Sequence, residues 1–300
     1  MPSLSIFGVV LAAALVVPPI AAGAGSPAVV TILDGSAIVF RGTSKLGAAA
    51  CVRVQPNDLV ETGKDTFARL EFDDGTRLDL GSETRLQVNN PSEAVADRAA
   101  LYVLSGWIKL SFDDSKRTRP PEFATPLSDG TELSGVVLAH VDTRGGALFV
   151  EQGRARIVNR HARVPAPPAL KTGDFASIAK DGKVVIDTRP SSNFVDQMPR
   201  TFRDTIPSRF ALCRDHEVAP KAPGDFSYGE VESWLNAEPS VRRQFVHTWR
   251  AKADETAFRT LLTAQIGLHP EWGPVLFPEL YAPKPVGPPW PIPEEAPARH

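Results

Sequence analysis

Histidine and acidic side chains are the first candidates for chemistry in this chain of 300 residues. The histidines are His140, His161, His216, His247, His269 and His300. No two of them have the spacing of zinc ligands beside a carboxylate, as in an H-E-x-x-H helix. Asp73-Asp74-Gly75 and Asp113-Asp114-Ser115 resemble the start of calcium loops, but neither continues into alternating acidic ligands with a distal glutamate. We expect turns at both places, and the sequence predicts no metal site and no other cofactor.

Catalytic signatures are also missing from the sequence, which has no G-x-S-x-G elbow, P-loop or dinucleotide fingerprint. The favoured prediction is therefore a protein that is not an enzyme. The alternative is an envelope hydrolase or modifying enzyme with its site between a β-rich half and a helical region, where Asp196, Asp204, His216 and Glu217 meet. Paired carboxylates or a histidine–aspartate contact in a deep cleft would support that alternative.

Two arginines, Arg154 and Arg156, are candidates for binding, because alternate residues of a strand share one face. Together they can hold an anionic glycan or a carboxylate of a partner protein. The alternative, which we favour, is a solvated face that discourages pairing between sheet edges. Trp290 is a further candidate contact, because it stands in the proline-rich tail and can dock on a partner or on its own domain; a disordered end is the alternative there.

The only cysteines are Cys51 and Cys213. In an exported protein such a pair can oxidise to a disulfide, which here would tie the β-rich half to the C-terminal part. Two separately buried thiols are the alternative. A catalytic thiol is not expected, because no nearby histidine completes a nucleophile motif.

Residues 1–24 have the pattern of a secretory signal peptide: an apolar run, a break at Pro18-Pro19, and the small residues Ala22-Gly23-Ala24 as a cleavage site. The apolar run is too short to cross a bilayer, so we expect cleavage near Gly25 and no stable membrane span afterwards; an uncleaved anchor is the alternative. The mature protein is expected in the periplasm or another extracytoplasmic compartment. A net charge of -2, from 33 basic and 35 acidic residues, makes nucleic acid an improbable partner and leaves an envelope protein or a glycan.

The stretch 66–80 predicts the element that organises the first half of the chain. Ala68 and Leu70 alternate with Arg69 and Glu71, as in a half-buried strand, and the same alternation returns at 77–80. Asp74-Gly75 between them predicts a two-residue type I′ turn. Strand patterns separated by Asp-Gly turns recur from 28 to 186, with a glycine bend inside 101–112. The expected fold is mainly β, a hairpin-built sandwich or stacked sheets over 25–187, followed by a small α-helical C-terminal region.

The second half of the chain changes character after 187. Residues 188–226 mix prolines and aromatic residues and predict an irregular connecting segment that lies on the sandwich, with a short helix near 199–205. A helical region is expected over 227–282, because Ser227 and Glu230 have capping-box spacing and Pro239 suits the first turn of a second helix. Residues 283–300 form a proline-rich tail that predicts extended chain.

Several of these segments, in this order, resemble FecR domains. Residues 30–40, the corner Pro56-Asn57-Asp58-Leu59-Val60-Glu61-Thr62-Gly63 and the hairpin 68–80 match the opening of that family, which runs from a strand through a "G-D-x-V-x-T-G" corner to a strand-"DGS"-strand hairpin. Segments at 104–108, 123–126, 150–157 and 170–174 follow the family's order. Asn57 stands where the family has glycine, and the family's loop after Thr125-Pro126 is loosened.

The resemblance implies an extracytoplasmic binding, sensing or scaffold module. In the best-known FecR proteins this domain is the periplasmic half of a signal-transducing sensor, behind a cytoplasmic anti-sigma segment and one membrane helix, and it contacts an outer-membrane transporter. Here a signal peptide stands where that segment would be, so we expect the extracytoplasmic domain without the anti-sigma function. Resemblance of fold does not name the partner.

Overall fold

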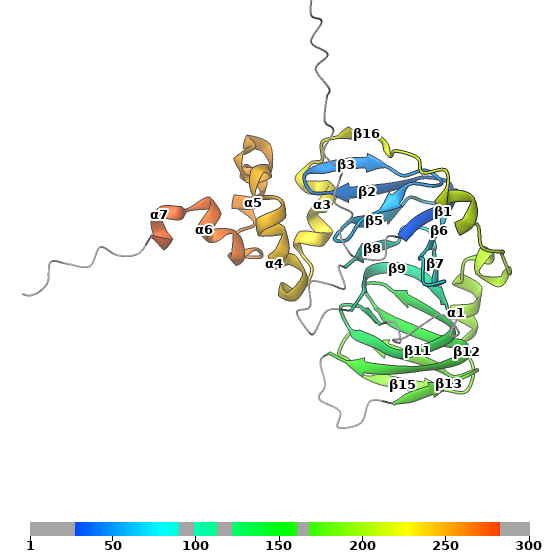
Figure 1. Cartoon of the computed structure of the whole chain (residues 1–300). Coiled ribbons are helices and arrows are strands. Elements are labelled where there is room, and N and C mark those ends of the chain that lie inside the picture. The colour runs from blue at the N-terminus through cyan, green and yellow to red at the C-terminus, as the bar shows by residue number, and fades with distance from the viewer. Residues whose placement is uncertain (1–27, 90–98, 113–121, 161–167, 283–300) are drawn as a thin grey trace, which may run out of the picture.

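The structure is a computed structural model that describes residues 28–89, 99–112, 122–160 and 168–282. The described chain is mainly β, as the sequence predicts, with helices after the strands (Figure 1). The strands are β1 (Ala28–Asp34), β2 (Ala37–Arg41), β3 (Ser44–Gly47), β4 (Arg53–Val54), β5 (Leu59–Thr62), β6 (Phe67–Glu71), β7 (Arg77–Leu80), β8 (Arg85–Val88), β9 (Leu101–Ser111), β10 (Phe123–Ala124), β11 (Ser128–Val141), β12 (Gly145–Asn159), β13 (Ala169–Lys171), β14 (Phe175–Ala179), β15 (Val184–Asp187) and β16 (Lys221–Gly224).

These strands form one hydrogen-bonded network that is folded into two layers. The first layer runs β16-β3-β2-β5-β8 and continues through the N-terminal part of β9, β10, the N-terminal part of β11, the C-terminal part of β12 and β13. The second layer runs β4-β1-β6-β7 and continues through the other parts of β9, β11 and β12 to β14 and β15. The three long strands therefore belong to both layers and hold them together.

Glycines allow the long strands to pass from one layer to the other. Gly106 in β9 has φ +103, and the register partners Gly135 and Gly153 in β11 and β12 have φ +73 and +92. A Cβ atom on Gly153 would lie 2.3 Å from the carbonyl oxygen of Ser134, which is impossible without moving the backbone. Left-handed backbone at these points bends the strands, so the glycine bend expected inside 101–112 is present at Gly106.

The central hairpin of β6 and β7 is present, but its turn is not the predicted two-residue type I′ turn. Leu70 pairs with Leu78, and the last bonded pair is Phe72 with Thr76, whose carbonyl accepts the Phe72 N–H at 2.9 Å. The loop therefore has three residues, Asp73-Asp74-Gly75, with Gly75 at φ +84. The Asp74 carboxylate accepts the N–H of Thr76 at 2.8 Å, which stabilises this longer loop.

The main apolar core lies between the two layers. Val39, Val60 and Leu86 enter it from the first layer, and Leu70, Leu78 and Ile108 from the second. Along β2, β5, β6 and β9 the neighbouring residues point to the opposite side, as the two-residue period of a strand requires. In this protein both of those outer faces are covered as well, each by a part of the chain that follows the strands.

The helical region covers the outer face of the first layer, on the left in Figure 1. Its elements are α3 (Tyr228–Leu235), α4 (Pro239–Thr248), the 3-10 helix η2 (Arg250–Asp254), α5 (Thr256–Ala264), the 3-10 helix η3 (Pro270–Trp272), α6 (Gly273–Leu276) and α7 (Pro278–Tyr281). The Ser227–Glu230 capping box is formed, and Pro239 occupies the first position of α4. Trp234 and Trp249 are fully buried, and their indole N–H groups donate to Glu61 Oε1 at 2.6 Å and to the Gly42 carbonyl at 3.0 Å.

Residues 194–206 of the segment 188–226 cover the outer face of the second layer, where α1 lies on the right in Figure 1. The short helix expected near 199–205 is present as the 3-10 helix η1 (Arg200–Arg203), and the segment also contains α1 (Ser192–Gln197), α2 (Phe210–Arg214) and β16, which the prediction of an otherwise irregular connection did not include. Phe194 and Phe202 are buried against Phe67, Trp107 and Phe175 of the sheet. Burial of these aromatic rings orders short elements that are too weak to form alone.

A disulfide joins Cys51, after the β3 strand, to Cys213 in α2, with the sulfur atoms 2.05 Å apart. The segment that covers the second layer is therefore covalently attached to the sandwich. Within the described residues no helix is long and apolar enough to cross a membrane. Four features of the sequence analysis lie outside the described residues: the predicted signal peptide at 1–24, the turn at 113–115, His161, and the tail at 283–300 with Trp290.

Candidate functional site

Charged side chains on the outer face of the second layer are buried, although the sequence predicts a half-exposed hairpin. Arg69 and Asp79, opposite each other on β6 and β7, form a two-pronged ion pair with distances of 2.5 and 2.8 Å. Arg69 also donates to the Ile206 carbonyl at 2.7 Å, and Lys109 of β9 donates to the Phe202 carbonyl at 2.6 Å. These charges are paired or hydrogen-bonded, as buried charges must be, and they fasten the segment after α1 to the sheet.

A hollow of about 450 Å³ remains beside this attachment. Arg69, Asp79, Lys109, Glu151 and Asp204 line it. Lys109 Nζ lies 2.8 Å from Glu151 Oε2, so the charges that line this hollow largely satisfy one another. This Lys109 hollow is better explained as part of the attachment than as a site for a ligand.

A larger hollow, of about 640 Å³, opens at the end of the sandwich where several turns meet. We call it the Trp107 hollow. Its lining comes from the turn after β1, the turns 63–66 and 81–84, the bend of β9, the end of β11, and the segment 197–201. It thus combines parts of the sandwich with the segment that covers the second layer.

One wall of the Trp107 hollow is a stacked pair of rings. The rings of Trp107 and His140 have centroids 4.2 Å apart and an angle of 24° between their planes, and Phe194 packs against Trp107 at 4.9 Å. Trp107 is only 8% exposed, but its indole N–H, which has no hydrogen-bond partner in the described part of the chain, is not itself buried and can be reached by solvent. Burial lowers the pKa of His140, with opposing effects of Asp142 and Arg144, so the imidazole is neutral at neutral pH.

Carboxylates form the rim of this hollow. Asp34, Asp65 and Glu83 line it, are exposed, and accept no hydrogen bond and join no ion pair among the described residues. A fourth carboxylate, Asp142, is different: burial opposes its ionisation, but hydrogen bonds from the Arg144 side chain and from the backbone N–H groups of Arg144 and Gly145 outweigh this and lower its pKa.

The backbone of the rim is held in an unusual conformation. Asp65 and Glu83 both have positive φ, +53 and +52, which is uncommon for residues other than glycine. The Asp65 N–H donates to Ser82 Oγ at 2.9 Å, and the Glu83 N–H donates to the Gly63 carbonyl at 3.1 Å. These bonds tie the two turns together, so the two carboxylates are presented by a braced rim.

The polar groups of the Trp107 hollow can bind a ligand. Its free groups are carboxylates, a neutral imidazole and an indole N–H, and among the described residues no cluster of histidine, cysteine or acidic side chains is arranged to hold a metal ion. The hydroxyl-bearing residues that line the hollow are Thr66, Ser82, Ser105, Thr143 and Thr201, and no hydrogen bond joins any of them to the His140 ring in the described structure. The hollow offers acceptors to a ligand, but no nucleophile activated by a base.

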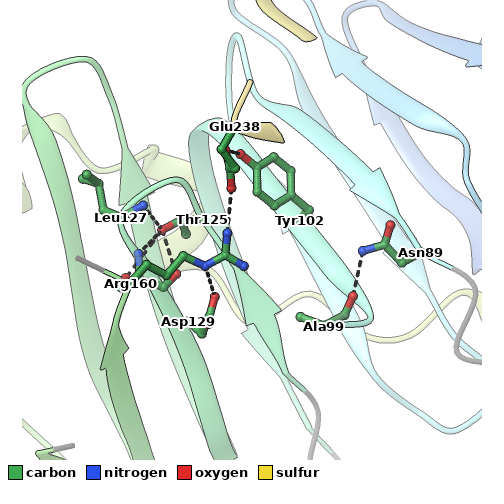
Figure 2. A network of polar contacts seen from close by, with 9 residues as sticks. Asn89, Ala99, Tyr102, Thr125, Leu127, Asp129, Arg160 and Glu238 are labelled. Atoms are coloured by element: carbon green, nitrogen blue, oxygen red, sulfur yellow. Dashed lines mark hydrogen bonds and ion pairs between the residues drawn. The ribbon is translucent and has the colours of Figure 1, made fainter. Parts of the chain in front are cut away.

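A second polar cluster joins the helical region to the sandwich (Figure 2). Glu238, which precedes α4, accepts a hydrogen bond from the Tyr102 hydroxyl and lies 2.6 Å from Arg160, whose Nε lies 2.6 Å from Asp129. Burial and the Glu238 carboxylate raise the pKa of Tyr102 well above its ordinary value, so the phenol stays a donor. Every charge drawn in Figure 2 has its partner, and the cluster is an attachment of the two parts.

The predicted binding arginines lie elsewhere. Arg154 and Arg156 are both on β12, where Arg154 is exposed and Arg156 pairs with Glu132 at 3.0 Å. Arg160 is used in the cluster of Figure 2. The structure therefore places the two arginines near the β11–β12 ladder, away from the residues that line the Trp107 hollow.

The four residues of the enzyme alternative do not meet. Asp196 is on α1, Asp204 follows η1 and lines the Lys109 hollow, and His216 follows α2. Glu217 pairs with Arg53 at 2.6 Å. All four are exposed, and no hydrogen bond or ion pair joins any two of them.

The sequence reasoning missed the Trp107 hollow because its residues are far apart in the chain. In the sequence, His140 is a candidate only as a metal ligand. One signal was present: Asp34 ends β1, Asp65 and Glu83 stand in short connections between strands, and turns of consecutive hairpins gather at the ends of a sandwich.

Comparison with known proteins adds little. No family model matches the chain, and no curated protein matches it. Two crystal structures from Parabacteroides distasonis ATCC 8503, each described as a putative anti-sigma factor, are similar to part of it, with TM-scores of 0.36 and sequence identities of 15% and 13%. Each comparison covers 44% of this chain and 59% of the other, so the chain spans less than two thirds of the length of these neighbours. Likenesses this distant carry no argument about function.

Proposed function

We propose that this chain is an exported, non-enzymatic protein with a FecR-like domain, which acts as a binding, sensing or scaffold module in the cell envelope. The Trp107 hollow carries the proposal, because it collects uncommitted polar groups on a braced scaffold at the turn end of a sandwich. Binding residues commonly lie on loops that a rigid scaffold positions.

The FecR-like part of the proposal rests on the order of sequence motifs and on their local geometry. Asn57, which replaces the family's corner glycine, has φ +70. Asparagine is one of the few residues other than glycine that adopts this conformation readily, so the replacement preserves the corner. The departure from the family pattern at this position is therefore conservative.

The export part of the proposal is supported by the disulfide. Cys51 and Cys213 are 162 positions apart in sequence, and their bond closes the segment over the second layer. Disulfides of this structural kind persist in oxidising compartments and are rare in the cytosol of most organisms. An envelope location also agrees with the signal-peptide pattern of residues 1–24.

The test is the fate of the full chain when it is expressed with its own N-terminus in a bacterial host that has a periplasm. We expect a protein in the periplasmic fraction that begins near Gly25 by mass spectrometry and whose two cysteines resist alkylation until a reductant is added. A chain that lacks residues 1–24 is the control and should stay in the cytoplasm with alkylatable thiols. A full-length protein that keeps Met1 and remains in the cytoplasm would refute export.

A further inference from the structure

We propose that two copies of this chain associate through β15, with the free edges of the two β15 strands paired antiparallel across a twofold axis. The second layers of two sandwiches then form one continuous sheet. This contact goes beyond the proposed function, since it is independent of the Trp107 hollow and of any ligand.

β15 is one of four strands that have a free edge within the described part of the chain. The others are β4, β13 and β16. β4 has two residues, β13 has three and ends in Lys171, and β16 joins β3 with a shifted register. Very short, charged or irregular edges discourage pairing. β15, at the bottom of the sandwich in Figure 1, is regular and begins with three aliphatic residues, so it is the least protected of the four.

The backbone of β15 has groups available for another strand. The Ala179 N–H donates to the Lys183 carbonyl at 2.9 Å. In an antiparallel ladder every second residue faces the neighbouring strand, so Val185 also bonds to β14, and Val184 and Ile186 direct their N–H and C=O groups away from it. No hydrogen bond among the described residues uses these four outward groups.

The side chains at this edge are apolar and accessible. Val185 is 44% exposed and Ile186 is 43% exposed, although both are β-branched residues that suit a sheet interior. Val184 packs at the margin of the core between the layers. Another strand on this edge would cover apolar surface and satisfy backbone groups at the same time.

A twofold axis at Val185 gives a register that uses every available group. Val184 lies opposite Ile186 of the second copy, and these are the residues with outward backbone groups, so each of the two symmetric pairs exchanges two hydrogen bonds. Val185 lies opposite Val185 of the second copy in the pair that is not hydrogen-bonded, where side chains come closest.

Charge favours a second copy over an unrelated strand. In this register Lys183 lies opposite Asp187 of the second copy, on the same face as Val185. Both side chains are exposed, and neither joins an ion pair among the described residues. Opposite charges directly across a ladder stabilise it, so the edge is complementary to itself in the antiparallel direction.

The geometry also determines the size and strength of the assembly. Each β15 has one free edge, so the pairing closes at two copies and does not continue into a fibre. Four residues from each copy make a small interface, and we expect a dimer that dissociates on dilution.

The first experiment is sedimentation equilibrium of the mature chain, with its disulfide intact, in buffer of low ionic strength and at concentrations up to about 1 mM. We expect a monomer–dimer equilibrium. Val185→Lys should abolish the dimer, because it places two like charges directly opposite each other at the axis.

A charge exchange tests the register. Lys183→Glu and Asp187→Lys, each made alone, put like charges opposite each other at two symmetric positions and should raise the Kd of the dimer about tenfold. Mixing the two variants restores both opposite-charge pairs, so a dimer of the two should form with nearly the original Kd. Recovery on mixing cannot come from misfolded chains.

Lys64→Glu is the matched control for Lys183→Glu. Lys64 is exposed in the turn after β5, joins no ion pair among the described residues, and gives the same change in net charge. It should change the Kd of the dimer by less than about twofold, since exposed charges beyond a Debye length are screened.

Four results would overturn the inference. A dimer that survives Val185→Lys would use another surface, and equal weakening by Lys183→Glu and Lys64→Glu would show an effect of net charge alone. Absence of recovery on mixing would exclude the register. A chain that is monomeric at every concentration would leave the β15 edge to a strand of a different protein. None of these results affects the test of export and thiol state.

Discussion

At the scale of single residues, Gly106 shows how one backbone conformation decides the course of a strand. Its φ of +103 places β9 in both layers, and an added Cβ would lie 2.4 Å from Cα of Thr84. The neighbouring bend of β11 and β12 likewise depends on the positive φ angles of Gly135 and Gly153. Three strands cross between layers because glycine is available where they bend.

We predict that Gly106→Ala lowers the free energy of unfolding by about 2 to 4 kcal/mol, because the backbone must leave a left-handed conformation and the contact with Thr84 must relax. Urea unfolding followed by circular dichroism measures this loss. Gly229→Ala is the control: no atom lies within 4 Å of the added Cβ, and the residue is inside α3, so this variant should gain up to about 1 kcal/mol. Equal midpoints for the two variants would mean that the bend carries no strain.

At the scale of elements, short segments are held by what they cover. α1, η1 and α2 each have six residues or fewer, and none would be stable alone. Arg69 and Lys109 donate to backbone carbonyls of this segment, and the disulfide anchors α2. The polar face of the central hairpin thus binds the connecting segment and is not exposed to solvent.

We predict that reduction of the Cys51–Cys213 disulfide lowers the free energy of unfolding by up to about 5 kcal/mol. The bond spans 162 residues, so breaking it restores much conformational entropy to the unfolded chain. Urea unfolding with and without reductant measures the change, and a Cys51→Ser/Cys213→Ser variant, insensitive to reductant, is the control. A reductant effect of the same size in that variant would contradict the explanation.

At the scale of the whole molecule, neither outer face of the sandwich is left free. The helical region buries Phe40, Leu59 and Tyr102, and the connecting segment buries Phe67 and Trp107. The ion pairs of Glu238 and Arg160 and the indole bonds of Trp234 and Trp249 cross the first of these contacts. The β-domain and the helical region are therefore expected to unfold together.

We predict a single cooperative unfolding transition for the mature chain. Tryptophan fluorescence mostly reports on the helical region, where Trp234, Trp249 and Trp272 are buried, and far-ultraviolet circular dichroism reports on the strands as well. The two signals should have coincident midpoints in urea. A chain that ends at Asp187 exposes both apolar faces and leaves Cys51 unpaired, so we expect it to aggregate. Separate midpoints and a soluble truncated chain would show that the two parts are independent.

The local sequence pattern determined the positions of many strands, two helix starts and one strand bend. Alternation along 66–80 and its repeats determined the strands, the Ser227–Glu230 spacing and Pro239 determined where two helices begin, and a glycine marked the bend of β9. These features depend on residues close in the chain, where side-chain period, capping and φ preference act directly. The length of the central turn was misjudged because a three-residue loop, with its Asp74 hydrogen bond, competes closely with a two-residue one.

Only the tertiary structure decided which polar residues would be buried and which would be left free. From the sequence, the polar face of the central hairpin is expected to be solvated, but in the structure the segment 200–209 covers Arg69, Glu71 and Asp79. Likewise, the sequence gives no sign that Asp34, Asp65 and Glu83 lie close to Trp107, where several turns meet. Both outcomes depend on contacts between segments separated by tens to more than a hundred residues. The energy of a charged group is set by its surroundings, and the period of a strand carries no information about what will cover its outer face.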